Sequence, residues 1–369
     1  MTNPENSDDK FEYDGRLVFN GIYLESDDGT PFQSKESVLS ELPEFEEGAP
    51  GNAGSGFQDL QLSDWAERYE ELPDENQEVI SNIWDVEFIH EVYQPGEDLV
   101  DSQGDPVEGY VADEWSAYVY WYPGDFLIIQ ASQSKLDDVE EQLFPIIGRT
   151  NFETNGSEGS NDSDEDDDDD DDGNGGNGSS PHEGLFDPEF LQWIVWKYDT
   201  LGGPSRFGVE RLSDASMSGN LSYFGKSNEV SDSRDITSSH PIIAGMLENR
   251  NFDDLEGVFE VHGHKVDAQI HADGSIRVMA QEDVGDASQF ERALLANLFL
   301  QRFLEEYMNW RASDPDEKYV DPKYFHELHE HAKDMEESAN YDFDFDSLVR
   351  HYADLRNEDP RNYSFQFDT

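Results

Sequence analysis

The chain has 369 residues, of which 35% are apolar and 12% aromatic, enough to form the packed cores of two domains of ordinary size. Its formal net charge is −63, from 86 acidic and 23 basic residues. It contains no cysteine, which excludes disulfides, thiolate catalysis and cysteine-ligated metal sites.

The first part of the chain, residues 1–150, has the pattern of an antiparallel sheet followed by a packed helix. Apolar residues alternate with acidic ones over 84–92, which predicts a half-buried strand. Residues 115–131 predict a hairpin that turns at Pro123 and Gly124. An apolar stripe over 136–143 predicts a helix that ends before Pro145.

Segment 48–56 is rich in glycine. It lacks the Gly-Lys-Ser/Thr sequence of a phosphate-binding loop, and no strong strand pattern precedes it. We therefore expect a flexible linker within the first module.

The predicted hairpin carries aromatic residues on both faces. Tyr118, Tyr120 and Tyr122 alternate onto one face, opposite Trp115 and Trp121. Because one helix covers only one face of a sheet, these tyrosines are the candidate binding surface, for the other half of the chain, a partner or a ligand. Cover by the N-terminal helices is the alternative.

The end of this hairpin leads into its helix through Gln130-Ala131-Ser132-Gln133-Ser134-Lys135. This passage resembles the strand-turn-helix of helix-grip folds, such as the saddle of TATA-binding proteins, over about 50 residues and as architecture alone. The resemblance implies nucleic-acid association through a sheet face. The negative charge of the chain does not support such a partner.

Residues 151–183 predict a disordered acidic linker, with seven consecutive aspartates at 166–172 among Gly, Ser and Asn. The segment lacks the glycine spacing and terminal Glu of a calcium loop. It divides the chain into two modules.

The second module, residues 184–369, opens with a helix. Asp187, Pro188 and Glu189 have the cap, first-turn proline and first-turn acid of a helix start, and Gly202-Gly203 ends the helix. An apolar pattern predicts a long helix over 287–311, and helices over 322–338 and 345–357 complete a helical C-terminus.

A hairpin over 265–280 precedes the long helix. A three-residue loop with Gly274 in the left-handed position pairs Ile270 with Ile276, and in this register Ala268 faces Val278 and Val266 faces Ala280. A polar face then carries Lys265, Asp267, Gln269, His271, Ser275 and Arg277. The fold class is therefore α+β, with two modules that each contain an antiparallel sheet followed by a packed helix.

Two groups of histidines contain enough possible ligands for a metal site. His326 and His329 share a helix face, whereas His331 lies about 200° further round from His329, so the three do not converge. The second group is His262, His264 and His271, of which the last two fall on opposite strand faces. We therefore predict no metal site and no cofactor.

The sequence indicates no catalytic residue, because the motifs of serine hydrolases, zinc proteases and Walker loops are missing from it.

The acidic excess extends beyond the linker, since removing residues 158–172 takes away 11 charges and leaves −52. Self-repulsion of this size opposes folding unless salt screens it, and the Debye length falls to about 3 Å at molar salt. The composition resembles that of cytoplasmic proteins from salt-in halophiles, archaea in particular. The first residues have no signal-peptide pattern and no apolar run approaches a membrane span, so we expect a cytoplasmic protein without a membrane partner.

Together these features favour a non-enzymatic interaction or regulatory protein, with a protein partner or a second copy of itself. A hydrolase or nuclease with a scattered Asp, Glu and His site is one alternative. A nucleic-acid-associated protein that binds through a sheet face is another.

Overall fold

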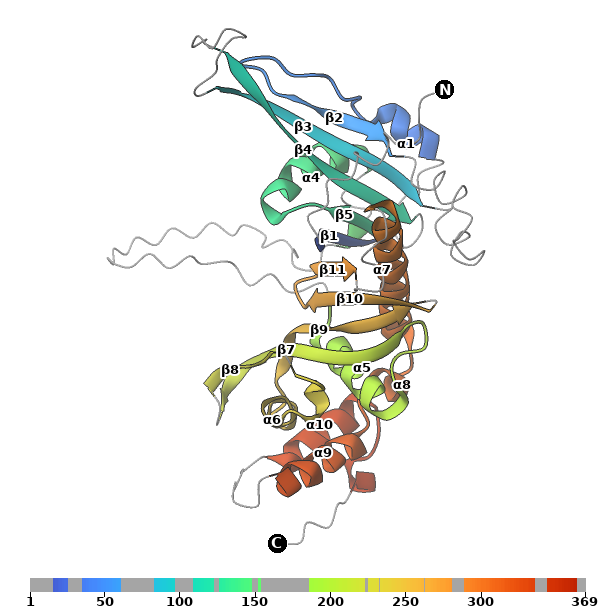
Figure 1. Cartoon of the computed structure of the whole chain (residues 1–369). Helices are drawn as coiled ribbons and strands as arrows, with labels where there is room; N and C mark the ends of the chain where they lie inside the picture. Colours follow the sequence, from blue (N-terminus) through green and yellow to red (C-terminus); the bar gives the residue numbers. More distant parts are fainter. Residues whose placement is uncertain are drawn as a thin grey trace, which may run out of the picture.

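The computed structural model describes residues 16–25, 35–60, 83–96, 109–122, 126–147, 152–153, 186–222, 225–231, 233–261, 263–280, 289–335 and 344–363. In this part of the chain the fold is α+β and is built on one large antiparallel sheet. The described strands pair in the order β2-β3-β4-β5-β1-β11-β10-β9-β7-β8, with β6 beside β1. The sheet extends from β2 and the β3-β4 pair at one end of the molecule to β7 and β8, beyond which lie the helices α9 and α10 (Figure 1).

The strands come from both halves of the sequence. Those of the first half are β1 (Arg16–Glu25), β2 (Gly54–Asp59), β3 (Trp84–Pro95), β4 (Tyr110–Tyr122), β5 (Phe126–Gln130) and β6 (Phe152–Glu153). Those of the second half are β7 (Gly208–Ser222), β8 (Gly225–Val230), β9 (Asn251–Val261), β10 (His264–His271) and β11 (Ile276–Ala280).

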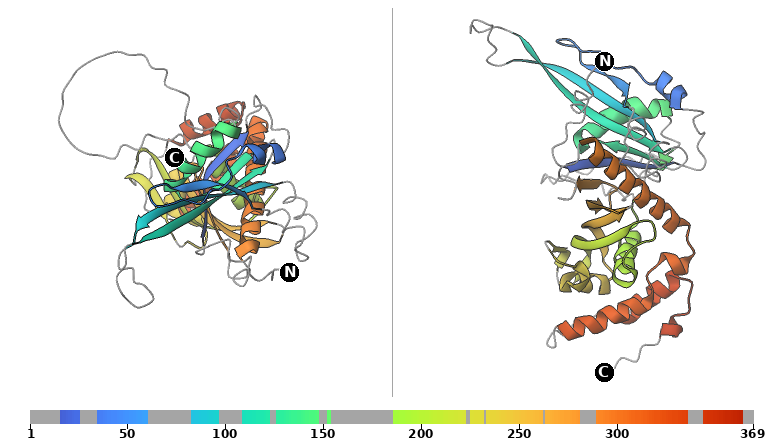
Figure 2. Two further views of the ribbon diagram at one scale, coloured as in Figure 1. Left: turned by 90° about the horizontal axis from the view of Figure 1, so that it is seen from above. Right: turned by 45° about the vertical axis from the view of Figure 1, so that its right-hand side comes forward.

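Helices lie on both faces of this sheet. The first half contributes α1 (Lys35–Glu41) and α4 (Gln133–Ile147). The second half contributes α5 (Pro188–Leu201), α6 (His240–Leu247), α7 (Gln289–Ala312), α8 (Pro315–Lys318), α9 (Pro322–Met335) and α10 (Phe345–Leu355). Figure 2 shows α7 running beside the sheet, with α9 and α10 at the C-terminal end of the molecule.

Two hydrophobic cores result from this arrangement. The smaller one lies between the first-half strands and the helices α1 and α4, with Phe88, Val139 and Ile147 fully buried or nearly so. The larger one lies on the opposite face, where α5, α6 and α7 pack against second-half strands. The larger core also includes first-half residues such as Phe19 and Phe126. Residues from both halves therefore share one core.

Strand β1 connects the two halves of the sheet. Its first residues pair with β11, from Arg16 opposite Met279 to Phe19 opposite Ile276. Its later residues pair with β5 as far as Leu24 opposite Phe126. The prediction of two separate sheets is therefore not confirmed, because backbone hydrogen bonding runs without interruption from one half into the other.

Several local predictions are confirmed. Strands β10 and β11 pair in the predicted register, with Ile270 opposite Ile276 and Val266 opposite Ala280, and Gly274 has a φ of 98°. Asp187 accepts a hydrogen bond from the backbone N–H of Glu189 at 3.0 Å and so caps α5. Gly202 ends that helix in the left-handed conformation. In each case residues close in sequence determine the conformation.

Two other expectations differ from the structure. Helix α4 continues through Pro145 to Ile147, because the proline lies near the helix end and the residues around it are buried in the smaller core. The glycine-rich segment 48–56, predicted as a flexible linker, contains the start of β2. A Cβ on Gly54 would lie 2.4 Å from the backbone nitrogen of Gly48, so glycine permits the close approach of two backbones here. The turn at Pro123 and Gly124 lies outside the described residues, as does the acidic linker apart from Phe152–Glu153.

Candidate interaction surface

The tyrosine face of β4 lies inside the protein. Tyr118, Tyr120 and Tyr122 are 7%, 0% and 4% exposed and belong to the larger core. The hydroxyl group of Tyr122 donates to the carbonyl oxygen of Asn297 on α7 at 3.4 Å, and that of Tyr120 donates to Oε1 of Gln130 at 3.0 Å. The tyrosine face that the sequence indicates as a binding surface therefore packs against the second half of the chain and is not exposed to solvent.

Two carboxylates of β3 share this buried face. Asp85 lies opposite Tyr120, Glu87 lies opposite Tyr118, and both acids are buried. Burial holds the pKa of Tyr120 and of Tyr122 well above the usual value, and the charge of Asp85 raises both further. Both phenols therefore keep their protons and act as hydrogen-bond donors. The sequence pattern placed these acids on the polar side of a half-buried strand. It gave no signal that the second half would cover that side.

Strands β3 and β4 form a ribbon that is buried at its inner end and exposed at its outer end. These strands pair along their whole length, from Trp84 opposite Trp121 to Pro95 opposite Tyr110. The neighbouring strand β5 pairs with β4 only from Tyr118 to Tyr122. In the described part of the chain, the backbone edge of residues 110–117 on that side therefore has no strand partner. Figure 1 shows the ribbon extending beyond the other strands of the sheet.

The outer end of the ribbon combines exposed apolar and acidic side chains. Tyr110 is 55% exposed and Val111 is 49% exposed, and Asp113 and Glu114 beside them are exposed too. At the inner end of the open edge, the ammonium group of Lys135 lies 4.8 Å from the centre of the Trp115 ring. The free edge thus runs from an apolar tip through an acidic stretch to a half-buried tryptophan.

The histidine groups do not form a metal site in the described residues, where no three His, Asp or Glu side chains come together as metal ligands. His329 on α9 stacks on Phe345 with ring centres 5.2 Å apart, and its pKa is lowered by burial and then by Lys333. His331 is exposed, away from this contact. His264 and His271 fall on opposite faces of β10, and His262 lies outside the described residues.

One arrangement on the polar sheet face contains the residue types of a hydrolase. Ser216 donates a hydrogen bond to Asp254, and Asp254 lies opposite His271 on the neighbouring strand. In a nucleophilic triad the serine bonds to the histidine and the acid holds the far side of the imidazole. Here the acid lies between the other two residues, so the geometry does not activate the serine.

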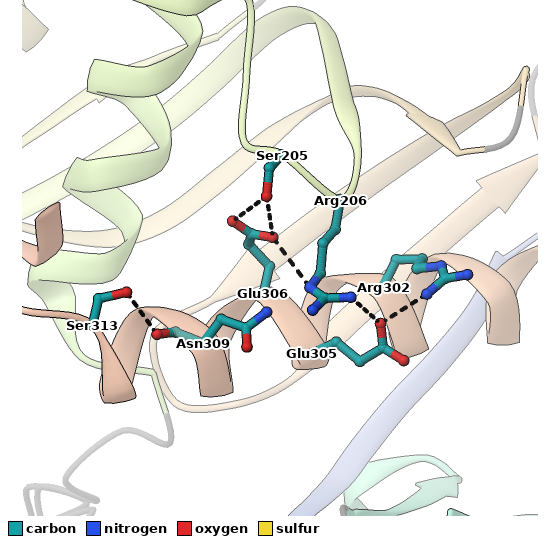
Figure 3. A network of polar contacts seen from close by, with 7 residues as sticks. All are labelled: Ser205, Arg206, Arg302, Glu305, Glu306, Asn309 and Ser313. Carbon is teal, nitrogen blue, oxygen red and sulfur yellow. Dashed lines mark hydrogen bonds and ion pairs between the residues drawn. The ribbon is translucent and has the colours of Figure 1, made fainter.

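A polar network holds the loop before β7 against α7 (Figure 3). Ser205 donates to both carboxylate oxygens of Glu306, at 3.3 and 3.2 Å, and Nε of Arg206 lies 3.6 Å from the same carboxylate. Arg206 and Arg302 both reach Glu305, at 3.0 and 2.9 Å. The side chain of Glu306 is only 7% exposed, so these contacts compensate a nearly buried charge.

In the part of the chain that the structure describes, no helix combines the length and the apolar character needed to cross a membrane. No model of a known protein family matches the chain, and no curated protein matches it either.

Proposed function

We propose that this protein binds an extended segment of a partner protein, which adds as a strand to the open edge of β4. The observation that carries this proposal is that, among the described residues, no strand pairs with 110–117 on the β5 side of a ribbon that projects from the sheet. An exposed strand edge offers a row of backbone donors and acceptors, and partner chains use such rows for strand addition.

The side chains of the edge favour a cationic partner. Asp113 and Glu114 are exposed at its centre, and the chain as a whole carries a net charge of −63. Lysine or arginine side chains on the added strand would lie beside these carboxylates, where opposite charges across strands stabilise pairing. The exposed Tyr110 and Val111 offer apolar contact at the tip.

Self-association through the same edge is the less favourable alternative. If two copies paired antiparallel about the acidic centre, Asp113 and Glu114 of one copy would lie beside those of the other. Like charges directly opposite one another destabilise a strand pair. A positively charged segment does not meet this repulsion.

In this proposal the protein is a non-enzymatic interaction or regulatory protein of a salt-rich cytoplasm. The two halves are joined by the acidic linker, by the pairing of β1 with β11 and by the larger core, and the first half carries the ribbon. At molar salt the attraction between charges is short-ranged, so backbone hydrogen bonds and the apolar tip supply most of the affinity. The charges then mainly select the partner.

Fluorescence anisotropy with short labelled peptides and the full chain in molar KCl tests the proposal. A peptide that alternates Lys with Val or Thr should bind, whereas the Glu-for-Lys version should bind at least tenfold more weakly. The same Lys peptide with N-methyl groups on consecutive residues keeps its side chains but loses backbone donors on both edges. It should also lose binding.

The matched variants exchange charge at two places on the protein. Asp113→Lys with Glu114→Lys should weaken binding of the Lys peptide, whereas Glu327→Lys with Glu330→Lys, on the exposed side of α9, should leave it unchanged. Equal binding of the N-methylated and unmethylated peptides would show that no strand is added, and the proposal would then be wrong.

A further inference from the structure

Helix α10 closes over a carboxyl group in the first turn of α5. The hydroxyl group of Tyr352 donates to Oε2 of Glu189 at 2.8 Å, across 163 positions of sequence. Tyr352 is fully buried, and Phe345, Leu348 and Val349 of the same helix are buried in the larger core. The contact therefore lies where the C-terminal helix packs onto the body of the protein.

The surroundings of Glu189 are short of positive charge. The described groups that act on its pKa are Tyr352 and Asp187, the residue that caps α5. From α7, the Tyr307 hydroxyl accepts a hydrogen bond from the backbone N–H of Asp187 at 3.4 Å. Burial, followed by the charges of Asp187 and Glu189, raises the pKa of Tyr319, which lies between α8 and α9. Arg356, just after α10, contacts the carbonyl oxygen of Tyr319 and the carboxylate of Glu358.

Burial raises the pKa of Glu189 to about 7, although the hydrogen bond from Tyr352 lowers it, and the charge of Asp187 raises it further. A carboxyl group whose pKa is higher in the folded than in the unfolded state contributes stability that is complete below the unfolded pKa. That contribution is lost as the pH rises through the folded pKa. The contribution of Glu189 is therefore lost between its ordinary pKa of 4.5 and its folded-state pKa of about 7.

We propose that Glu189 makes the docking of α10 sensitive to pH near neutrality. With Glu189 protonated, α10 packs over a neutral group. With Glu189 ionised, the same packing holds a half-buried negative charge two residues from Asp187, and the helix opens more often. Opening would expose the apolar face formed by Phe345, Leu348 and Val349. The C-terminal helix is then a regulated cover, independent of the ribbon.

Hydrogen–deuterium exchange on the full chain in molar KCl measures this opening directly. Protection of the α10 amides, corrected for intrinsic exchange rates and compared with α7, should fall as the pH is raised from 5 to 8.5. We take the pKa of Glu189 as 4.5 when α10 is open and about 7 when α10 is docked. The opening equilibrium then changes about 300-fold between pH values well below the lower pKa and well above the higher one.

Two variants identify Glu189 as the titrating group. Glu189→Gln should remove the pH dependence of α10 protection, and Tyr352→Phe should shift its midpoint to higher pH, because a hydrogen bond that lowers the pKa is lost. Glu327→Gln, an exposed change on α9, should behave as the parent chain does. Retained pH dependence in Glu189→Gln, or equal pH dependence of α10 and α7 in the parent chain, would overturn the proposal.

Discussion

The hydroxyl group of Tyr122 on β4 lies 3.4 Å from the main-chain carbonyl oxygen of Asn297 on α7, although the two residues are 175 positions apart. Asn297 is fully buried, and its side-chain amide donates to the carbonyl oxygen of Ala293 at 2.9 Å. A strand from the first half of the chain is thus in contact with the interior face of a helix from the second. This contact, together with the β1-β11 pairing, joins the halves through both packing and backbone hydrogen bonds.

Replacing Tyr118, Tyr120 and Tyr122 together with Ser should sharply lower the melting temperature, because three buried rings are lost from the larger core. Truncating one buried aromatic side chain typically costs about 3–5 kcal/mol. Tyr122→Phe keeps the ring and removes only a long hydrogen bond, so it should cost about 1 kcal/mol or less. Thermal unfolding followed by near-UV circular dichroism compares the two. An unchanged melting temperature in the triple variant would contradict the observed packing.

The sequence predicts local structure well here, because neighbouring residues determine it. The register of β10 and β11 follows from alternation and from a glycine that can take a positive φ, and the ends of α5 follow from Asp187 and Gly202. Alternation also separated the tyrosines of β4 from its tryptophans. It could not show what covers each face, since that depends on contacts between residues 175 positions apart.

The open edge of the ribbon also depends on contacts that sequence alternation does not show. Sequence alternation shows which residues share a face, but the length over which β5 pairs with β4 depends on where the chain turns into α4. Asp85 and Glu87 likewise have the spacing of an exposed polar face. These two acids become buried only when the second half of the chain packs against this face of the sheet.

Cutting the chain within 160–180 tests how firmly the two halves are joined. Each half has its own strands and helices, but both share β1-β11 pairing and the larger core. We therefore expect the two pieces to remain bound to each other in molar KCl and to elute together on size exclusion. Weakening the contact with Phe19→Ala in the cut protein should release them, because Phe19 is fully buried where β1 pairs with both β11 and β5. Pieces that separate without this change would instead be independent modules.

Arg206→Ala should destabilise the protein by about 1–3 kcal/mol, because it removes a charged partner from the nearly buried Glu306. Adding Glu306→Gln should recover part of the loss, since the remaining charge is then neutralised. Lys333→Ala breaks an ion pair with Glu330 that is about half exposed on both sides, and should cost less than about 0.5 kcal/mol. Urea unfolding curves of the four proteins give these differences, and equal costs for the two single variants would contradict the role of burial.

Folding should depend on salt. With a net charge of −63 on 369 residues, repulsion within the folded chain is strong at low ionic strength and largely screened at molar salt. Far-UV and near-UV circular dichroism should therefore show a loss of structure when KCl is diluted from molar concentration to about 50 mM. Changing the seven aspartates of 166–172 to Asn leaves a net charge of −56 and should leave this dependence nearly unchanged, because most of the acidic excess lies outside that run. Full native structure of the parent chain at low salt would remove the argument for a salt-rich environment, and loss of the salt dependence in the Asn variant would place its source in the linker.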